Sequence, residues 1–301
     1  MFEALGLREI DPYWINILPV IHHSKTIQPA AETIKMFHVD SEVYESVSQL
    51  AGMWGKLVTD AGCSVADEDG LAIRWADARF AFYNALVVTS PVHHAERLKR
   101  LLSRSAEFMA GREQPGCVWI FEEMVSPDVR GKINDLALDA GLVSAFTCWG
   151  MAGDLSSLEE PSHPALRFER VTTAQHLDAY ASLNARAYGL SETDAMATFR
   201  GSRLWREEIF AYVAYEGSSA VACAGVCEVD GRLFLVLVAT DTDRQRRGFG
   251  EAVTRKAMYE AIQATGIERV CLQATAAGKP VYERIGLRQN SLLQLFSRRP
   301  G

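Results

Sequence analysis

The 301-residue sequence lacks any apolar run that approaches the ~18 residues of a membrane-spanning helix. Its N-terminus carries Glu3, Arg8, Glu9 and Asp11, so the basic-then-apolar order of a signal peptide is missing. Basic residues are not in excess either: 31 Lys and Arg stand against 38 Asp and Glu, for a net charge of −7. This balance argues against nucleic acid as the main partner. We therefore expect a cytoplasmic protein with neither a membrane nor a nucleic acid as partner.

Cysteine is scarce, and the six cysteines are scattered mostly through apolar runs. Such residues are typical of buried thiols in a reducing compartment. Cys223 and Cys227 stand four apart, but no second pair or histidine cluster accompanies them. A zinc site needs about four such ligands, so we predict no metal.

Length and composition allow one large or two ordinary domains, and 48% hydrophobic residues support real cores. The segment Asp154–Pro164 reads D-L-S-S-L-E-E-P-S-H-P, which is polar and contains two prolines. That composition is typical of a linker. We predict a first domain over residues 1–155, a linker over 156–165 and a second domain over 166–301.

One stretch carries most of the functional signal. An apolar strand pattern at Leu233–Ala239 is followed by Gln245–Gly250, which reads Q-R-R-G-F-G, and by a helical pattern over Glu251–Ala264. Backbone amides at a helix N-terminus bind anions, and glycine lets a phosphate come close. Arg246 and Arg247 add charge suited to phosphate oxygens. The same residues could also form a plain turn with solvated charges, and no other phosphate-loop pattern occurs here.

This stretch resembles motif A of the GCN5-related N-acetyltransferase (GNAT) superfamily, whose loop reads Q/R-x-x-G-x-G/A. A second segment, Val281–Leu287, reads V-Y-E-R-I-G-L and is similar to the end of motif B, which commonly reads Y-E-K-L-G-F. The resemblance covers roughly residues 167–297. A strand, two helices with Ser191 capping the second, and three strands precede the loop, as in GNAT proteins.

The first half repeats part of this order. Strand, helix, strand, helix, Gly-Leu and strand run from Phe80 to Met151, with the second strand at Cys117–Phe121 and the second helix at Pro127–Ala140. A helix over Ser41–Gly62, which Ser41 can cap, precedes them. No Q-R-R-G-F-G run occurs there. We predict an α/β (α+β) protein with two GNAT-like domains in tandem, each a mixed, mostly antiparallel sheet flanked by helices, the first degenerate and without cofactor. The alternative is that this order of strands and helices is simply common among α/β proteins and indicates no second GNAT-like domain.

The resemblance implies acetyl-CoA as co-substrate. Its pantetheine arm would lie along the end of the fourth GNAT strand, and its pyrophosphate on the loop amides. Thr275 stands where the family often has asparagine, and Gly278 would let the cofactor approach. The implied cofactor-binding residues are Val238, Ala239, Thr240, Gln245, Arg246, Arg247, Gly248, Phe249, Gly250, Glu251, Thr275 and Gly278.

Catalytic roles are less clearly marked. Tyr282 occupies the position of the family's thiolate-protonating tyrosine, although it could equally be a packing residue. Glu228 is the nearest candidate for a general base. The alternatives are that it is an exposed carboxylate at a strand end, that water removes the proton, or that Asp241 or Asp243 does so, both of which more naturally cap the loop.

Substrate contacts in the family come from the first two helices and the last strands. Tyr188, Phe199, Trp205 and Phe210 are therefore candidates, although aromatic residues are more often core. The sequence predicts transfer of an acetyl group to the amine of a small molecule or of a peptide amino terminus. A non-catalytic acyl-CoA sensor and an acyltransferase with a longer acyl donor are the alternatives. The oligomeric state stays open, with a homodimer as one option.

Overall fold

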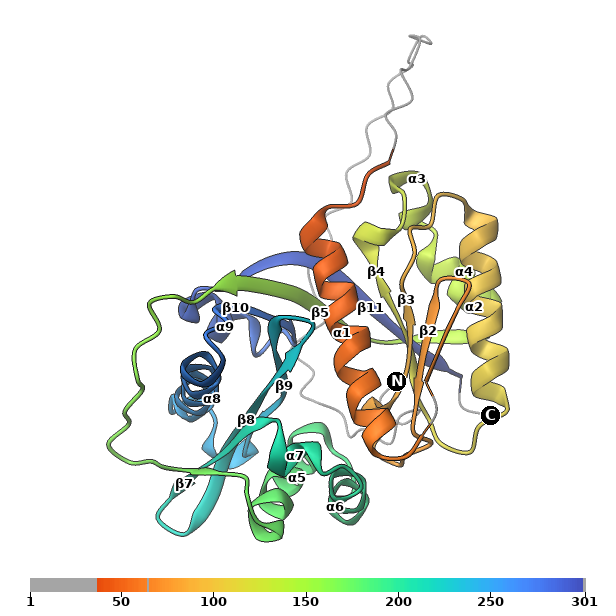
Figure 1. The fold of residues 1–301 in the computed structure, drawn as a ribbon. Coiled ribbons are helices and arrows are strands. Elements are labelled where there is room, and N and C mark those ends of the chain that lie inside the picture. The colour runs from red at the N-terminus through yellow and green to blue at the C-terminus, as the bar shows by residue number, and fades with distance from the viewer. Residues whose placement is uncertain (1–36, 64, 300–301) are drawn as a thin grey trace.

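The computed structural model describes residues 37–63 and 65–299, and its strands form one continuous sheet (Figure 1). The strands are β1 (Val65–Glu68), β2 (Leu71–Trp75), β3 (Asn84–Val88), β4 (Cys117–Phe121), β5 (Leu142–Asp154), β6 (Arg167–Arg170), β7 (Phe210–Glu216), β8 (Ser219–Val229), β9 (Arg232–Thr240), β10 (Arg269–Ala274) and β11 (Arg288–Arg298). Most pairs are antiparallel, and β3–β4 and β9–β10 are parallel. The predicted fold class is confirmed.

Helices connect and cover these strands. They are α1 (Ser41–Asp60), α2 (Ala95–Ala110), α3 (Pro127–Arg130), α4 (Ile133–Asp139), α5 (Ala174–Tyr188), α6 (Glu192–Arg200), α7 (Leu204–Glu207), α8 (Phe249–Thr265) and α9 (Lys279–Ile285), with short 3₁₀ turns η2 (Ala81–Tyr83), η3 (Glu122–Met124) and η4 (Thr242–Arg244). Within the described ranges, no helix is both long and apolar enough to cross a membrane.

The two halves of the chain exchange their last strands. The strand order is β1-β2-β3-β4-β11-β5-β10-β9-β8-β7-β6. Thus β5, from the first half, lies between β10 and β11, and β11, from the second half, lies between β4 and β5. In Figure 1 both strands run behind α1 from one half to the other. The connection predicted as a linker joins the end of β5 to β6 at the opposite sheet edge.

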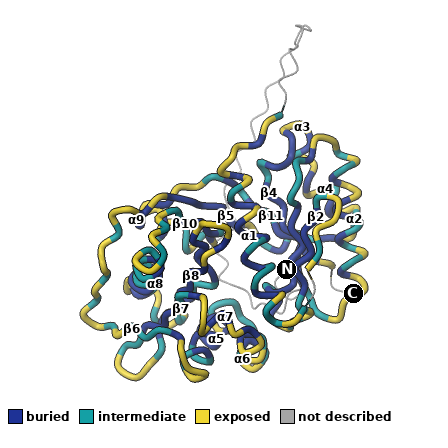
Figure 2. Tube along the Cα trace, viewed as in Figure 1, coloured by how far each residue is buried: buried dark blue, intermediate teal, exposed yellow. Residues whose placement is uncertain are grey.

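Apolar side chains on alternate strand positions bury the sheet on both faces. One face is covered by α1 and by α5, α6 and α7, and its buried residues form a single cluster that includes strands from both halves. The other face carries two separate clusters, one under α8 and α9 and one under α2, α3 and α4. Figure 2 shows the buried positions concentrated along the strands and the inner sides of the helices.

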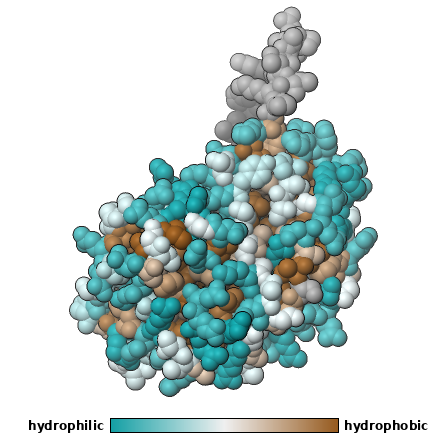
Figure 3. Space-filling view, viewed as in Figure 1, coloured by the Kyte–Doolittle hydropathy of each residue, from teal (hydrophilic) through white to brown (hydrophobic). Residues whose placement is uncertain are grey.

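Among the described residues, large apolar side chains are exposed only at scattered positions. They are Tyr44, Val65 and Leu138, which lie apart in the sequence on different elements. On the face drawn in Figure 3, hydrophilic residues dominate and the apolar surface is broken into small areas.

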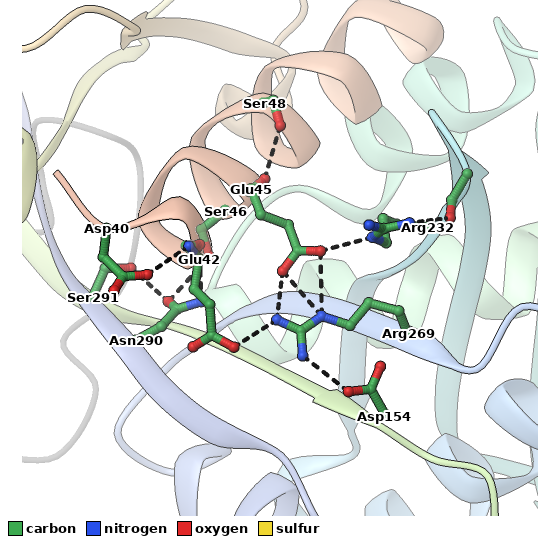
Figure 4. A network of polar contacts seen from close by, with 11 residues as sticks. Asp40, Glu42, Glu45, Ser46, Ser48, Asp154, Arg232, Arg269, Asn290 and Ser291 are labelled. Carbon is green, nitrogen blue, oxygen red and sulfur yellow. Dashed lines mark hydrogen bonds and ion pairs between the residues drawn. The ribbon is translucent and has the colours of Figure 1, made fainter.

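A polar network fastens α1 to the second half (Figure 4). The Glu45 carboxylate accepts from Arg269 at 2.6 Å and from Arg232 at 2.7 Å. Arg269 also pairs with Glu42 at 2.8 Å and with Asp154 at 3.4 Å. Burial by itself raises the pKa of Glu45, but hydrogen bonds from the two arginines outweigh it and hold that pKa below its ordinary value. Charge pairing therefore joins α1, β9, β10 and β5 at one place.

Two local predictions need correction. Asp40, not Ser41, caps α1, because its side chain accepts from the amide of Glu42 at 2.8 Å. The single helix predicted for residues 127–140 is two helices, α3 and α4, which meet at Gly131 and Lys132.

Candidate functional site

The parallel strands β9 and β10 pair over a short length only. Val270 pairs with Leu233 and Cys271 with Phe234, and the pairing stops there. β10 continues along β5 as far as Ala274, while β9 continues along β8 as far as Thr240. The facing edges, residues 235–240 of β9 and 272–274 of β10, are therefore unpaired with each other; we call this region the strand split.

A β-bulge shapes the β9 side of the split. The β8–β9 register shifts between Cys223 and Gly225, and Leu237 adopts a positive φ of 49°. This conformation is unfavourable for a branched residue, and the Tyr180 hydroxyl stabilises it. That hydroxyl lies 3.1 Å from the carbonyl oxygen of Val236 and 2.9 Å from that of Leu237. Tyr188 likewise donates to the carbonyl of Val238 at 3.3 Å.

The predicted phosphate loop lies at the end of β9 and opens α8. Gly248 is the N-cap of α8 with a φ of 80°, and no side chain caps the helix. The first helical hydrogen bond runs from the amide of Ala252 to the Gly248 carbonyl at 3.0 Å. The amides of residues 249–251 therefore precede the helical ladder and remain available as donors. Their positions fit the anion site that the sequence predicts.

Gly250 sets how close the helix comes to the strand. A Cβ atom at this position would lie 2.6 Å from the Thr240 Oγ1 atom. Only glycine lets the start of α8 rest directly against the end of β9. Gly248 differs, since a Cβ there meets nothing within 4 Å and its backbone conformation is what requires glycine.

The loop arginines are not equivalent. Glu216 accepts from Arg244 at 2.9 Å and also pairs with Arg247, and Arg247 is the main cause of its lowered pKa. The Arg247 guanidinium lies 4.5 Å from the centre of the Phe249 ring, which is buried. Arg246 is exposed and makes no ion pair with any residue in the described ranges. Of the two predicted phosphate-binding arginines, Arg246 thus keeps its charge free, and Arg247 shares its charge with Glu216.

Tyr282 lies on α9 and is 7% exposed. Burial raises the pKa of its phenol far above the ordinary value, and nearby Cys148 of β5 raises it further. The hydroxyl therefore remains a proton donor at physiological pH. A Cβ atom at Gly278 would lie 2.9 Å from the Tyr282 ring, so this glycine makes room for the tyrosine. Thr275 accepts from the amide of Gly278 at 3.3 Å and shapes the same turn.

Comparison with known proteins agrees with this geometry. The family model of the acetyltransferase (GNAT) domain matches residues 207–288, which include the strand split, the loop and Tyr282. Residues 207–288 are thus similar to the GNAT acetyltransferase domain. No curated protein matches this sequence.

Solved structures show the same fold over most of the chain. A GCN5-related N-acetyltransferase from Kribbella flavida is similar with a TM-score of 0.64 and 17% identity, covering 85% of this chain and 96% of that one. One from Sphaerobacter thermophilus has a TM-score of 0.54 and 13% identity over 88% and 98%. A tandem GNAT protein from the clavulanic acid biosynthesis pathway has a TM-score of 0.52 and 10% identity over 85% and 96%.

Over residues 37–63 and 65–154, the described part of the first half has no comparable split. Its parallel strands β3 and β4 pair at three positions, and the two segments that follow these strands pair with each other again. Val92 forms a parallel bridge with Val125, accepting from Ser126 at 2.9 Å and donating to Met124 at 2.8 Å. α2 then begins after His94, where no glycine stands. Backbone pairing thus occupies the place that is open between β9 and β10.

The structure does not bring the predicted substrate residues together. Trp205 and Phe199 are fully buried and stack at 4.7 Å, and the Trp205 indole donates to the Tyr83 hydroxyl at 2.9 Å. Phe210 packs on the α8 face of the sheet under the Arg170 guanidinium, whereas Tyr188 packs on the opposite face. Trp205 thus lies in the core, Phe210 lies on the α8 face, and Tyr188 lies next to the split.

Glu228 is also far from the split. It is exposed on β8 and pairs with Leu233, at the opposite end of β9 from Thr240. The structure therefore does not bring Glu228 to the split where the reaction is expected. Asp241 caps η4 by accepting from the amide of Asp243 at 3.2 Å and pairs with Arg186 at 2.9 Å.

Two features near the site carried no sequence signal. A cavity of about 570 Å³ lies between linker residues 157–162 and the first turns of α8, next to Gly248. On the α5 side of the sheet, Phe82 from the first half packs against both Tyr188 and Phe146. Both depend on contacts between distant segments. Within the described residues, no group of three His, Cys, Asp or Glu could hold a metal ion.

Proposed function

We propose that this protein is an acetyl-CoA-dependent N-acetyltransferase whose acceptor is the amine of a small molecule or of an amino terminus. The strand split, together with the free amides at the start of α8, carries this proposal. An unpaired strand edge offers backbone groups to an extended, amide-containing arm such as pantetheine. The adjoining amides and the exposed Arg246 offer donors to a pyrophosphate.

Each group has a role that follows from its position. The β9 edge at Val238, Ala239 and Thr240 holds the pantetheine arm. The amides of residues 246–251 hold the pyrophosphate, with Gln245 at the entrance of the loop. The cavity beside Gly248 leaves room for the rest of the nucleotide.

The reaction is direct attack of a neutral amine on the thioester carbonyl. A C–N bond forms, the C–S bond breaks, the amine loses a proton and the thiolate gains one. Tyr282 donates to the leaving sulfur, since burial keeps its phenol protonated. β9 carries no carboxylate, and Glu228 is remote, so water takes the proton of the amine.

The first half is proposed to be a GNAT-like half without a cofactor, over residues 1–155. The bridge between Val92 and Val125 supports this, because it fills the position of the split. Coenzyme A should therefore bind with a stoichiometry of one per chain.

Thiol release from acetyl-CoA across a panel of amines tests the proposal. We expect amine-dependent release, and a fall of roughly 10²-fold in kcat for Tyr282→Phe with little change in coenzyme A affinity. Glu228→Gln is the matched control and should keep full turnover. If coenzyme A binds but no amine increases thiol release, the protein is an acyl-CoA sensor instead.

A further inference from the structure

Three aromatic rings from separate parts of the chain meet beside the strand split. Phe82 of η2 lies 4.9 Å from Tyr188 at the end of α5, edge to face, and 6.1 Å from Phe146 of β5. All three rings are partly exposed, whereas the neighbouring Phe80 is fully buried. We call Phe82, Phe146 and Tyr188 the aromatic wall. Two of its members come from the first half.

The wall adjoins the place where the thioester would lie. The Tyr188 hydroxyl reaches the Val238 carbonyl at 3.3 Å, and Leu237 packs on the same cluster. Phe146 and Cys148 stand two apart on β5 and point to one face, that of the cluster to which the wall belongs. Tyr282 packs with the cluster on the other face of the sheet. The exchanged strand β5 thus contributes Phe146 to the wall.

The chemistry of this surface is apolar. Its partly buried neighbours on the same cluster include Leu190, Met196 and Leu237. Covering apolar area stabilises a complex by roughly 25 cal/mol per Å², and aromatic rings prefer the edge-to-face contacts that these rings already make with each other. An acceptor with a polar substituent would lose water from its polar groups here without gaining hydrogen bonds in return.

We propose that the first half builds one side of the acceptor site, and that the acceptor is an amine attached to an aromatic or similarly apolar group that packs on the aromatic wall. This inference rests on the proposed acetyl transfer. It gives the cofactor-free half a direct part in substrate selection.

Calorimetric titration of the coenzyme A-loaded full chain tests the inference without requiring turnover. The probes are 2-phenylethylamine and ethanolamine, which share an aminoethyl group and differ in its substituent. We expect 2-phenylethylamine to bind roughly tenfold more tightly, since its ring has apolar area to bury. Phe82→Leu and, independently, Phe146→Leu should each weaken its binding about fivefold and leave ethanolamine unchanged. The control Phe108→Leu changes a ring on α2 that packs on Trp75 and should alter neither.

Each variant is first shown to bind coenzyme A with wild-type affinity, which reports an intact second half. Equal affinity for the two amines, or no effect of either wall variant, overturns the inference. If 2-phenylethylamine binds through the wall but no amine is acetylated, the enzymatic proposal fails, and with it the role of the wall in acceptor selection. If other amines are acetylated while 2-phenylethylamine ignores the wall, the enzyme stands and the inference fails.

Discussion

Gly250 is the point where the start of α8 touches the end of β9, so Gly250→Ala should weaken coenzyme A binding. The added Cβ would lie 2.6 Å from the Thr240 Oγ1 atom, whereas ordinary contacts begin at 3.4 Å. The helix start, the strand end or the Thr240 side chain must therefore move by about 0.8 Å, the difference of those two distances. Because the loop amides move with the helix start, the anion site is distorted.

The magnitude follows from two opposing effects. Overpacking of this kind costs about 1–3 kcal/mol, and alanine is about 1 kcal/mol better than glycine within a helix. If 1–2 kcal/mol of this overpacking cost destabilises the coenzyme A complex and not the free protein, the Kd for coenzyme A rises about 5- to 30-fold. The free energy of unfolding should change by less than about 1 kcal/mol, since the helix gain offsets part of the clash.

A double-mutant cycle with Thr240→Ala isolates the contact. Removing Oγ1 leaves the Thr240 Cβ atom 3.9 Å from the new methyl group, an ordinary contact. Thr240→Ala alone should bind coenzyme A with a Kd within about threefold of the wild-type value, and the double variant should have the same Kd as Thr240→Ala. This rescue is measurable because the coupling energy between contacting residues is about 0.5–3 kcal/mol. Isothermal calorimetry measures all four affinities. An unchanged Kd for Gly250→Ala, or no rescue in the double variant, refutes the placement of the loop amides at the cofactor.

Three further outcomes are expected. Gly248→Ala and Gly266→Ala each force alanine to a positive φ at one end of α8, and each should cost about 1–2 kcal/mol of unfolding free energy in urea, yet only the first should weaken coenzyme A binding. Arg269→Met should cost about 2 kcal/mol at pH 7, since it leaves Glu45 largely buried with one partner. The lowered pKa of Glu45 contributes stability that is present above about pH 4.3 and is lost as the pH falls. The difference in unfolding free energy between Arg269→Met and wild type should therefore be smaller at pH 3, as measured by urea denaturation. The kcat profile should rise with pH as the amine loses its proton and show no falling limb from Tyr282 below about pH 10, because burial raises that phenol's pKa; a falling limb that Tyr282→Phe removes would contradict this.

Much of the fold could be predicted because its signals are local. The strand at Cys117–Phe121 matches β4 residue for residue, and the loop and α8 follow from glycine, charge and apolar period. The cap of α1 was placed one residue late, as element ends often are. Gly131 and Lys132 separate the end of α3 from the start of α4. The apolar periodicity over Pro127–Ala140 does not reveal this break.

The arrangement of aromatic residues around the strand split could not be predicted, because it depends on which strands pair. Phe210 and Tyr188 both follow apolar patterns, and only the sheet shows that they pack on opposite faces. Phe146 acquires its place beside Phe82 from the insertion of β5 into the sheet, where it pairs with Leu295 of β11, more than a hundred residues away in the chain. Glu228 is close in sequence to β9, the strand that precedes the loop. The antiparallel pairing of β8 with β9 places it beside Leu233, at the end of β9 farthest from the loop.

The exchange of β5 and β11 makes each half a structural donor to the other. A chain cut back to its catalytic portion would leave β10 with one bare edge, and the discarded portion would lose the neighbour of β4. Exposed edges of this kind recruit other strands and promote aggregation. The first half, which we propose binds no cofactor, is therefore not dispensable, and a smaller version of this protein would have to supply a replacement strand.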